Sequence, residues 1–351
     1  MYTAAVIGCG RIGSLYDTRR SEASSDPLTH AGAYMSHPRT RLVAGVDPDP
    51  DRRALFTARW CVAAFATIED MLGRVSPDLW SVCAPPHAHA EIVGAAIRAG
   101  AYGIWCEKPL VASLPEAVRL VDQCAQARIP LLMNHTRRFD VFHQDLARRL
   151  QAGVWGAPER MLIHYVRGLC NYGSHAIDLA RFLLQDEIAW VSAWDELGED
   201  GDDPSLTVAG ATSRSVPISL VPARRRSYDA FEVDIWGAAG RVTISDLGKS
   251  VRQWRVGPSL HWDEPAVLLE TPGTFLPGMQ GAALAAVDNL VMHLRRRTAL
   301  ISTGRDAVMA LAAIAAARQS ARQSSRRVDV GALLAGITAA AIEPALTRSA
   351  A

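Results

Sequence analysis

A glycine-rich turn near the N-terminus has the residue types and the spacing that phosphate binding requires. It follows the apolar run Tyr2–Ile7 and reads Gly8-Cys9-Gly10-Arg11-Ile12-Gly13, a GxGxxG sequence. Glycine permits a tight turn and a close approach of a pyrophosphate to the backbone, and the next helix start offers free N–H donors. The pattern predicts a dinucleotide site formed by Gly8, Gly10, Arg11, Ile12 and Gly13. The alternative is a strand–helix turn that holds no ligand.

A carboxylate that could select the nucleotide ends the next apolar run, Arg41–Asp47. An acid at this position accepts hydrogen bonds from the ribose hydroxyls and repels a 2′-phosphate, so Asp47 predicts NAD over NADP. Asp47 lies farther along the chain than the usual ~20 residues. The excess is a polar insert, roughly Tyr16–Thr29, interpreted as a surface loop, with a lid over the site as the alternative. The other role open to Asp47 is a cap of the turn or helix at Pro48.

Lysine is rare in this chain, and one lysine stands where chemistry is expected. Only Lys108 and Lys249 are lysines among 37 basic residues. Lys108 follows an apolar strand-like run, at the sheet edge where open α/β folds bind ligands. Its presence in an arginine-rich chain indicates a role for a compact, titratable ammonium. Glu107 could anchor this lysine or its loop. The alternative is a surface lysine before a turn.

The elements that must position these residues change in character near residue 133. The first part alternates apolar strands with helices, which predicts a doubly wound parallel Rossmann sheet over residues 1–133. Strands are expected at Tyr2–Ile7, Arg41–Val46, Leu79–Cys83, Tyr102–Cys106 and Leu131–Met133, with helices near 50–59, 88–99 and 113–127.

Residues 134–330 are expected to form a second α/β domain with a large, mostly antiparallel sheet, because six strand-like runs follow one another without helices. These runs lie at 187–195, 205–212, 216–221, 229–237, 240–246 and 249–256. An earlier strand is expected at 159–166, and helices are expected near 138–151, 174–184, 281–296 and 304–323. Residues 331–351 form an Ala-rich tail that is expected to be frayed or disordered.

The composition narrows the class of protein. The 351 residues are 49% hydrophobic and 21% charged, with a net charge of +1, which argues against nucleic acid or an anionic membrane as partner. The Ala-rich stretch 307–317 is too short to span a bilayer, and the N-terminus lacks a basic secretory leader. Six cysteines without a CxxC pair indicate reduced thiols, and we expect a cytoplasmic location.

The chain resembles the glucose–fructose oxidoreductase, inositol dehydrogenase and MocA family over residues 2 to about 330. The matching segments, in order, are AVIGCGRIG (5–13), VAGVD (43–47), CAPPHAHAE (83–91), EKP (107–109), GSHAIDLARFLL (173–184) and FEVDIWGAAGRVTISD (231–246). The resemblance implies NAD as cofactor and a sugar, nucleotide sugar or cyclitol as substrate, oxidised or reduced at a secondary alcohol or ketone. It also implies a homodimer or homotetramer paired through the C-terminal sheet.

The resemblance implies roles for individual residues. Lys108 contacts substrate and the nicotinamide ribose, and the Lys108–Pro109 bond is cis. His175, at the start of a predicted helix, exchanges a proton at the reacting oxygen, for which a near-neutral pKa is suited; a histidine hydrogen-bonded at a helix start is the alternative. Asp178 matches the acid of an HxxD pattern and supports the site or the helix. Pro85, His87 and Glu107 are expected beside the cofactor.

Other positions leave alternatives open. Asn171 stands where many relatives carry aspartate, four residues before His175, and could still bind a substrate hydroxyl or orient that histidine. Tyr172 is expected to line the sugar site. Arg167 could hold an anionic substrate group or be solvated, and Arg138 could order the start of the second domain or meet substrate.

Two further function classes remain open, a catalytically silent dinucleotide-binding sensor and a reductase of another carbonyl or imine. The pair His87 and His89 could suggest a metal, but no third ligand lies near it in the sequence, and no metal site is expected.

Overall fold

The computed structural model describes residues 1–18, 26–198, 201, 203–224, 228–248, 250–259, 266–272, 279–296 and 298–338. The chain divides into two compact units, Met1–Asp140 with Gln280–Val308, and Val141–Met279 with Met309–Ala351. Helix α10 (Ala282–Arg296), which the sequence analysis placed in the C-terminal domain, belongs to the first unit.

The first unit is built on a six-stranded parallel sheet in the order β3-β2-β1-β4-β5-β6. This is the strand order of the dinucleotide-binding Rossmann fold, so the predicted fold of this part is confirmed. The strands are β1 (Tyr2–Ile7), β2 (Thr40–Val46), β3 (Ala64–Phe65), β4 (Leu79–Val82), β5 (Gly103–Cys106) and β6 (Leu131–Met133). Only β3 was not predicted, because two residues carry no readable periodicity.

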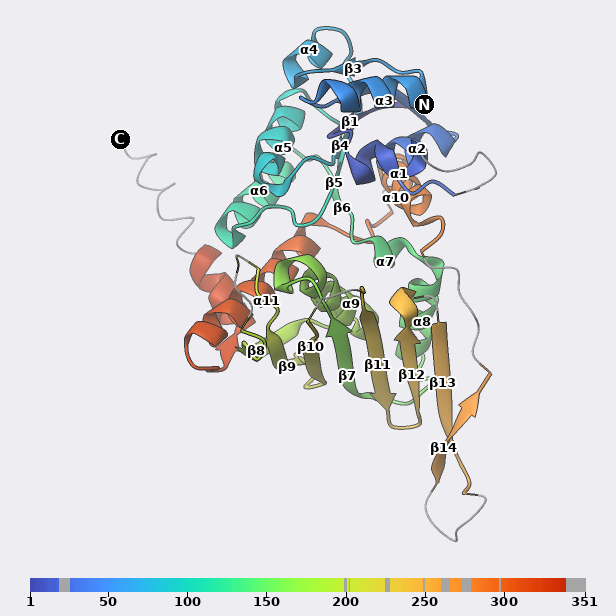
Figure 1. Ribbon diagram of the computed structural model, residues 1–351, viewed down its shortest axis with the longest axis vertical. Coiled ribbons are helices and arrows are strands. Elements are labelled where there is room, and N and C mark those ends of the chain that lie inside the picture. Colours follow the sequence, from blue (N-terminus) through green and yellow to red (C-terminus); the bar gives the residue numbers. More distant parts are fainter. Residues whose placement is uncertain are drawn as a thin grey trace. The chain divides into compact units, whose positions relative to one another are not determined.

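Helices cover both faces of this sheet, and Figure 1 shows α5 and α6 on one side with α2 and α10 on the other. Every residue of β4 and β5 is buried, as expected for parallel strands covered on both faces. The remaining helical elements of the unit are η1 (Arg11–Leu15), α1 (Tyr16–Thr18), α2 (His30–Ser36), α3 (Pro50–Trp60), α4 (Ile68–Leu72), η2 (Pro86–Ala88), α5 (His89–Arg98), α6 (Leu114–Gln126) and α7 (Thr136–Phe139).

The predicted polar insert begins and ends in ordered structure. The buried carboxylate of Asp17 accepts the backbone N–H groups of Leu28 and Thr29 and the hydroxyl of Thr29. Thr29 in turn caps α2, because its hydroxyl accepts the N–H of Gly32. Residues 19–25 of the insert lie outside the described residues, so the choice between lid and surface loop stays open.

The second unit contains a nine-stranded sheet in the order β14-β13-β12-β11-β7-β10-β9-β8-β15. Only β7 and β10 pair in parallel, and the other neighbours are antiparallel, which confirms the predicted mostly antiparallel sheet. The strands are β7 (Pro158–Tyr165), β8 (Ile188–Trp194), β9 (Thr207–Thr212), β10 (Pro217–Pro222), β11 (Phe231–Gly237), β12 (Gly240–Ser245), β13 (Ser250–Gly257), β14 (Val267–Thr271) and β15 (Val328–Asp329).

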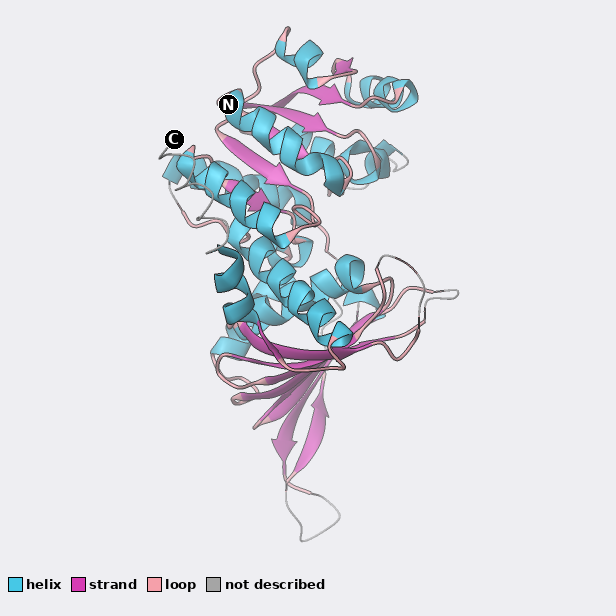
Figure 2. Cartoon of the chain, turned by 90° about the vertical axis from the view of Figure 1, so that its left-hand side faces the viewer, coloured by secondary structure: helices cyan, strands magenta, loops and turns pink. Residues whose placement is uncertain are grey.

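One face of this twisted sheet packs against helices, as Figure 2 shows. In β11 the residues Phe231, Val233 and Ile235 are buried, while the alternate residues Glu232 and Trp236 are exposed, as in a strand covered on one face. The helical elements are α8 (Val141–Gln151), η3 (Leu169–Gly173), α9 (Ser174–Leu184), η4 (Asp246–Gly248) and the part of α11 (Gly304–Arg322) after residue 308.

Two expectations for the helices need correction. The single helix expected near 138–151 is two helices, α7 and α8, separated at Asp140, whose φ of −77° and ψ of 127° are those of extended chain. Residues 330–338, the start of the predicted frayed tail, are helical, and 339–351 lie outside the described residues. Among the described helices, none is long and apolar enough to cross a membrane.

Candidate functional site

A cavity of about 1070 Å³ opens in the first unit where the predicted dinucleotide site was expected. Its lining comes from the glycine turn after β1, the end of β2, and the loop between β4 and α5. Seven predicted cofactor residues line it: Gly8, Gly10, Arg11, Ile12, Asp47, Pro85 and His87. The structure thus brings together residues from three separate sequence segments at the carboxyl edge of the parallel sheet, where ligands bind in such folds.

The three motif glycines serve different purposes. Gly8 has a φ of +100°, and a Cβ on it would lie 2.6 Å from the backbone of Cys83 and Ala84. A Cβ on Gly13 would lie 2.0 Å from the carbonyl oxygen of Gly8, so both glycines are required by the fold itself. At Gly10 the nearest described atom to an added Cβ is an Arg52 nitrogen at 4.0 Å. The protein leaves this space open beside the cavity, which fits a ligand that approaches the backbone.

Asp47 is buried, holds the glycine turn through hydrogen bonds and also lines the large cavity. Its Oδ2 accepts the backbone N–H of Cys9 at 2.9 Å, and its Oδ1 accepts that of Asp49 at 3.0 Å. The second contact is the turn cap that the sequence left open. Arg52 approaches the same carboxylate, with Nη1 3.7 Å from Oδ2. Burial and the charge of Asp47 raise the pKa of the Cys9 thiol to about 12, so this cysteine stays neutral in the turn.

The two histidines that follow β4, His87 in η2 and His89 at the start of α5, have different surroundings. His87 lines the cavity. His89 is buried, with Nε2 2.7 Å from the carbonyl oxygen of Ala84 and Nδ1 3.0 Å from those of Pro109 and Leu110. His89 therefore ties the cavity loop to the turn that follows Lys108. No group of three potential metal ligands occurs among the described residues.

Glu107 lies at the centre of a buried polar network beside Lys108. Its Oε1 is 3.2 Å from Nε2 of His30 and accepts the side-chain amide of Asn134. Its Oε2 accepts the backbone N–H of Lys108 at 3.2 Å. The Lys108–Pro109 peptide bond is cis, as the family resemblance implies. Glu107 thus connects the start of α2, the residue after β6 and the lysine two positions after β5.

The network continues from His30 into the core. Nδ1 of His30 lies 2.9 Å from the hydroxyl of Ser81, which is 2.9 Å from the hydroxyl of Tyr34. The imidazole stacks on Trp105 with ring centroids 3.4 Å apart, and Tyr34 meets the same indole edge-on. Tyr34, Ser81 and His30 are at most 1% exposed. Since buried polar groups cost free energy unless paired, this chain of contacts fixes all three side chains.

The environment sets the charges of the two central groups. Burial lowers the pKa of His30, which favours the neutral imidazole. Burial alone would raise the pKa of Glu107, but hydrogen bonds from His30 and Asn134 and the nearby Lys108 charge lower it. A neutral imidazole therefore donates its Nε2–H to an ionised carboxylate.

In the second unit, a carboxylate missed by the sequence analysis holds the turn before His175. Asp203 accepts the backbone N–H of Cys170 at 2.7 Å and that of Asn171 at 3.0 Å. The carbonyl oxygen of Asn171 accepts the Ser174 hydroxyl at 2.7 Å, which links this turn to the first residue of α9. His175 is the second residue of that helix and is half-buried.

Tyr172 and Arg167 lie around His175. The rings of Tyr172 and His175 meet edge-on with centroids 6.3 Å apart. The Arg167 guanidinium stacks over Tyr172 at 5.3 Å and binds both carboxylate oxygens of Asp229. The ion pair with Asp229 counters the charge of Arg167, and its guanidinium packs against Tyr172. Supporting Tyr172 is thus a third role, beside substrate binding and simple solvation.

Asp178 and Arg138 have structural contacts. Asp178 is buried on α9 with Oδ1 3.5 Å from Nη1 of Arg181, and Arg181 also binds Glu187 at 2.6 Å. These contacts favour the helix-supporting role over substrate binding. Arg138, buried in the first unit, pairs with Asp306 at 3.0 Å and donates to the carbonyl oxygen of Ile301 at 3.2 Å. An ordering role is favoured here too.

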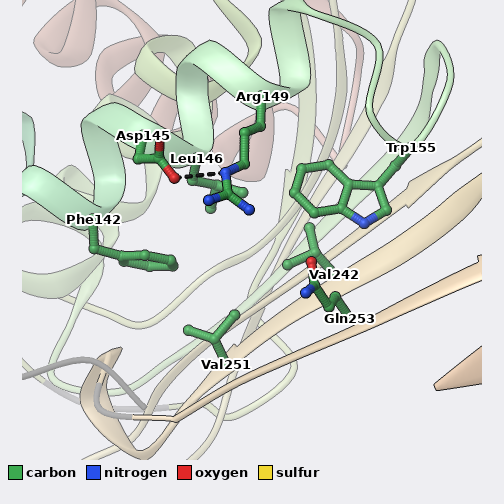
Figure 3. Close-up of a pocket in the computed structure, with 8 residues that line it drawn as sticks. All are labelled: Phe142, Asp145, Leu146, Arg149, Trp155, Val242, Val251 and Gln253. Carbon is green, nitrogen blue, oxygen red and sulfur yellow. Dashed lines mark ion pairs between the residues drawn. The ribbon is translucent and has the colours of Figure 1, made fainter. Parts of the chain in front are cut away.

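A second, smaller cavity of about 110 Å³ lies in the second unit between α8 and the strands β12 and β13. Figure 3 shows Phe142 and Trp155 at opposite ends of this cavity, with the Arg149–Asp145 pair above it. Nε of Arg149 is 2.6 Å from Oδ2 of Asp145, so its charge is already countered. No predicted site residue lines this cavity.

Sequence reasoning missed His30, Asp203 and Asp229. A signal for His30 was present, because histidine and tyrosine at positions 30 and 34 share one face of a helix. The two aspartates lie in loops with no periodicity, and only the folded chain brings them to the turn before His175.

Comparison with known proteins agrees with the geometry. Residues 2–135 match the family model described as an oxidoreductase family with an NAD-binding Rossmann fold. The myo-inositol 2-dehydrogenase of Thermotoga maritima is 23% identical over 69% of this chain and 75% of its own. Inositol 2-dehydrogenase 1 of Saccharopolyspora erythraea is 32% identical over 58% of this chain and 66% of its own.

A solved structure shares the fold of nearly the whole chain. The oxidoreductase from Agrobacterium radiobacter, crystallised with NAD+, L-tartaric acid and magnesium, superposes with a TM-score of 0.75. It is 20% identical, and the match covers 95% of this chain and 99% of that one.

Proposed function

The chain belongs to the glucose–fructose oxidoreductase, inositol dehydrogenase and MocA family, and on that basis we propose that it is an NAD(H)-dependent enzyme that transfers hydride to or from a secondary alcohol or ketone of a sugar, nucleotide sugar or cyclitol. The observation that carries the proposal is the open space at Gly10 beside Asp47 in the large cavity of the first unit. Backbone N–H groups at a helix start bind pyrophosphate, and a carboxylate at the end of the second strand binds ribose.

We assign a role in the reaction to each residue from the chemistry of its side chain. Bound NAD supplies the hydride acceptor or donor. Gly10 and the N–H groups that follow it hold the pyrophosphate, and Asp47 accepts hydrogen bonds from the adenosine ribose. His175 takes the proton of the substrate hydroxyl in the oxidation and returns it in the reduction. The Lys108 ammonium stabilises negative charge that develops on a reacting oxygen.

The substrate class is proposed from the residues around His175 and from the relatives. Tyr172 presents an aromatic ring next to His175, and aromatic faces pack well against the apolar faces of sugar rings. The net charge of +1 gives no overall field for a strongly charged polymer. Polyols therefore fit better than nucleic acids, and the inositol dehydrogenase relatives point the same way.

We further propose that the enzyme acts in the cytoplasm as a homodimer or homotetramer paired through the nine-stranded sheet. All six cysteines are free, which suits a reducing compartment. The outward row of the sheet carries Trp236, Arg241 and Trp254, with the guanidinium 4.5 Å and 4.9 Å from the two indoles. Aromatic residues and arginine are enriched at protein interfaces.

The proposal is tested by nucleotide binding followed by turnover. Fluorescence titration should show NADH binding, and a panel of cyclitols, sugars and nucleotide sugars should include at least one that reduces NAD. Binding of NAD without turnover of any polyol or of any matching ketone would favour the silent sensor. Turnover restricted to another carbonyl or imine would replace the substrate class and keep the cofactor site.

A further inference from the structure

A buried histidine on α2 is not accounted for by cofactor binding or by hydride transfer. His30 is 1% exposed and does not line the large cavity, yet its Nε2 lies 3.2 Å from the carboxylate next to Lys108. Burying an imidazole costs free energy unless both ring nitrogens have partners, and His30 has one on each.

The contacts have a consistent direction. Nε2–H donates to Oε1 of Glu107, so Nδ1 is the acceptor, and the Ser81 hydroxyl 2.9 Å away donates to it. Because the single hydroxyl hydrogen of Ser81 is then used, we infer that Ser81 accepts from the Tyr34 hydroxyl, whose oxygen is 2.9 Å away. Tyr34, Ser81 and His30 therefore form a chain of donors that ends on one carboxylate. Hydrogen bonds that point the same way reinforce one another in a low-dielectric interior.

The second oxygen of the carboxylate contacts the backbone of the proposed catalytic lysine. Oε2 of Glu107 accepts the backbone N–H of Lys108 at 3.2 Å, and the Lys108 charge lowers the pKa of Glu107. By reciprocity, the Glu107 charge stabilises the ammonium of Lys108. The glutamate can do this only while its carboxylate stays ionised and keeps its orientation.

The other groups around Glu107 do not take over the role of His30 in orienting the carboxylate. Asn134 donates an amide hydrogen to Oε1 but carries no charge. Burial and the charge of Glu107 raise the pKa values of the Cys83 and Cys106 thiols, so both stay neutral. Burial also raises the pKa of Tyr34. Lys108 supplies the positive charge that lowers the pKa of Glu107.

We propose that His30 is a positioning residue for Lys108. Its Nε2–H orients the Glu107 carboxylate, and the oriented carboxylate keeps Lys108 in its ammonium form. The proposal rests on the proposed function for the role of Lys108 in the reaction. Its physical content, the coupling from His30 through Glu107 to Lys108, can be measured without any substrate.

The protonation of Lys108 can be followed by NMR with little overlap, because the chain has only two lysines, Lys108 and Lys249. Full-length protein labelled with ¹³C at lysine Cε gives two side-chain signals, and Lys249→Arg leaves that of Lys108. In Glu107→Gln, the titration midpoint of the Lys108 signal should fall by about one pH unit, because the loss of the neighbouring negative charge removes a stabiliser of the ammonium.

The histidine variants then separate orientation from folding. His30→Phe keeps the stack on Trp105 and removes both hydrogen bonds, and its Lys108 midpoint should lie between those of the wild type and Glu107→Gln. His30→Gln keeps an N–H donor and should restore much of the wild-type midpoint. In the Glu107→Gln background, His30→Phe should cause no further shift, because the carboxylate through which it acts is gone.

A matched control lies on the same helix. His37 is buried at the end of α2 with Nε2 3.3 Å from Asp288, a second histidine–carboxylate pair. His37→Phe should lower the melting temperature and leave the Lys108 midpoint unchanged. A midpoint in His30→Phe equal to that of the wild type, in a folded protein, would overturn the proposal, and so would shifts of His30→Phe and Glu107→Gln that add in the double variant.

Kinetics complete the test once a substrate is found. His30→Phe should lower kcat while the KM for NAD changes less than twofold, since His30 does not line the nucleotide cavity. The pH–rate profile should move in the same direction as the Lys108 signal. Failure to find any substrate would count against the proposed function, whereas the NMR midpoints would still decide the coupling.

Discussion

The backbone N–H of Cys9 donates a 2.9 Å hydrogen bond to Oδ2 of Asp47, so one carboxylate fixes the glycine turn and also lines the large cavity of the first unit. Asp47→Ser should therefore weaken NAD binding by roughly 10- to 100-fold, the range expected for a lost hydrogen bond to a charged group. Binding of NADP relative to NAD should improve, because the repulsion of a 2′-phosphate is removed. Calorimetry with both nucleotides measures the change.

Asp47→Asn is the matched control. It keeps an acceptor for the Cys9 N–H but removes the charge and the acceptor of the Asp49 N–H, so the protein should fold with a somewhat lower melting temperature while its preference for NAD falls. Tighter binding of NADP than of NAD by the wild type would contradict this assignment of Asp47.

Two glycines of the same turn should respond differently to alanine. Gly13→Ala places a Cβ 2.0 Å from the carbonyl oxygen of Gly8 and should destabilise the protein or prevent its folding. Gly10→Ala has open space on the protein side and should fold with a nearly unchanged melting temperature, yet lose NAD binding. Thermal denaturation and NADH fluorescence titration separate the two effects. Retention of wild-type NAD affinity in Gly10→Ala would mean that the pyrophosphate does not lie there.

A new carboxylate at position 171 should alter the pH dependence of turnover. The carbonyl oxygen of Asn171 accepts the Ser174 hydroxyl, next to His175, so the two ends of this turn are close in space. In Asn171→Asp, the added charge should stabilise protonated His175 and move the basic-group midpoint of kcat/KM to higher pH. The comparison needs pH–rate profiles of both proteins with one substrate.

Asp203 provides the check on that interpretation, because it holds the backbone N–H groups of Cys170 and Asn171. Asp203→Asn should loosen the turn and lower kcat, with a smaller effect on the midpoint than Asn171→Asp. An unchanged midpoint in an active Asn171→Asp protein would assign Asn171 to the turn alone.

The buried His30 should make the protein sensitive to acid. Burial lowers the pKa of His30 below its ordinary value of 6.5. Between pH 6.5 and the lowered folded-state value, the unfolded chain binds a proton that the folded chain does not bind. Stability should therefore fall with decreasing pH in this window, by up to about 1.4 kcal/mol per pH unit from this residue.

His30→Gln has no titratable ring and should lack this part of the pH dependence. Urea denaturation of both proteins at several values between pH 5 and pH 7 measures the difference in unfolding free energy. Parallel curves for the wild type and His30→Gln would show that His30 takes up its proton equally in both states. Glu107, whose pKa is lowered, adds a loss of stability only at still lower pH.

Much of the fold could be predicted from the sequence because its signals are local. The strand before the glycine turn, the acid at the end of β2 and the helix that carries His175 each show in a few consecutive residues. The network around Glu107 could not be predicted in this way. His30 lies 77 residues before Glu107, and only the order of the parallel strands brings them together.

The same reason explains the missed carboxylates in the second unit. Asp203 is 32 residues after Asn171, and Asp229 is 62 residues after Arg167. Asp203 and Asp229 each lie in a loop between strands, and the sequence does not specify which strands pair and so which loops meet. The short β3 and α4 were missed because two and five residues are too few for a periodic pattern.

The central claim, NAD-linked hydride transfer assisted by Lys108, is tested most directly by turnover of Lys108→Ala on the substrate found in the polyol panel. The wild type should reduce NAD, and Lys108→Ala should do so roughly 100- to 1000-fold more slowly, because one stabiliser of developing charge is lost. Its NAD affinity should stay near that of the wild type, since Lys108 does not line the nucleotide cavity. Lys108→Arg should also fail, because the bulkier, planar guanidinium does not reproduce the compact charge of an ammonium. A Lys108→Ala enzyme that keeps half of the wild-type rate would contradict the account.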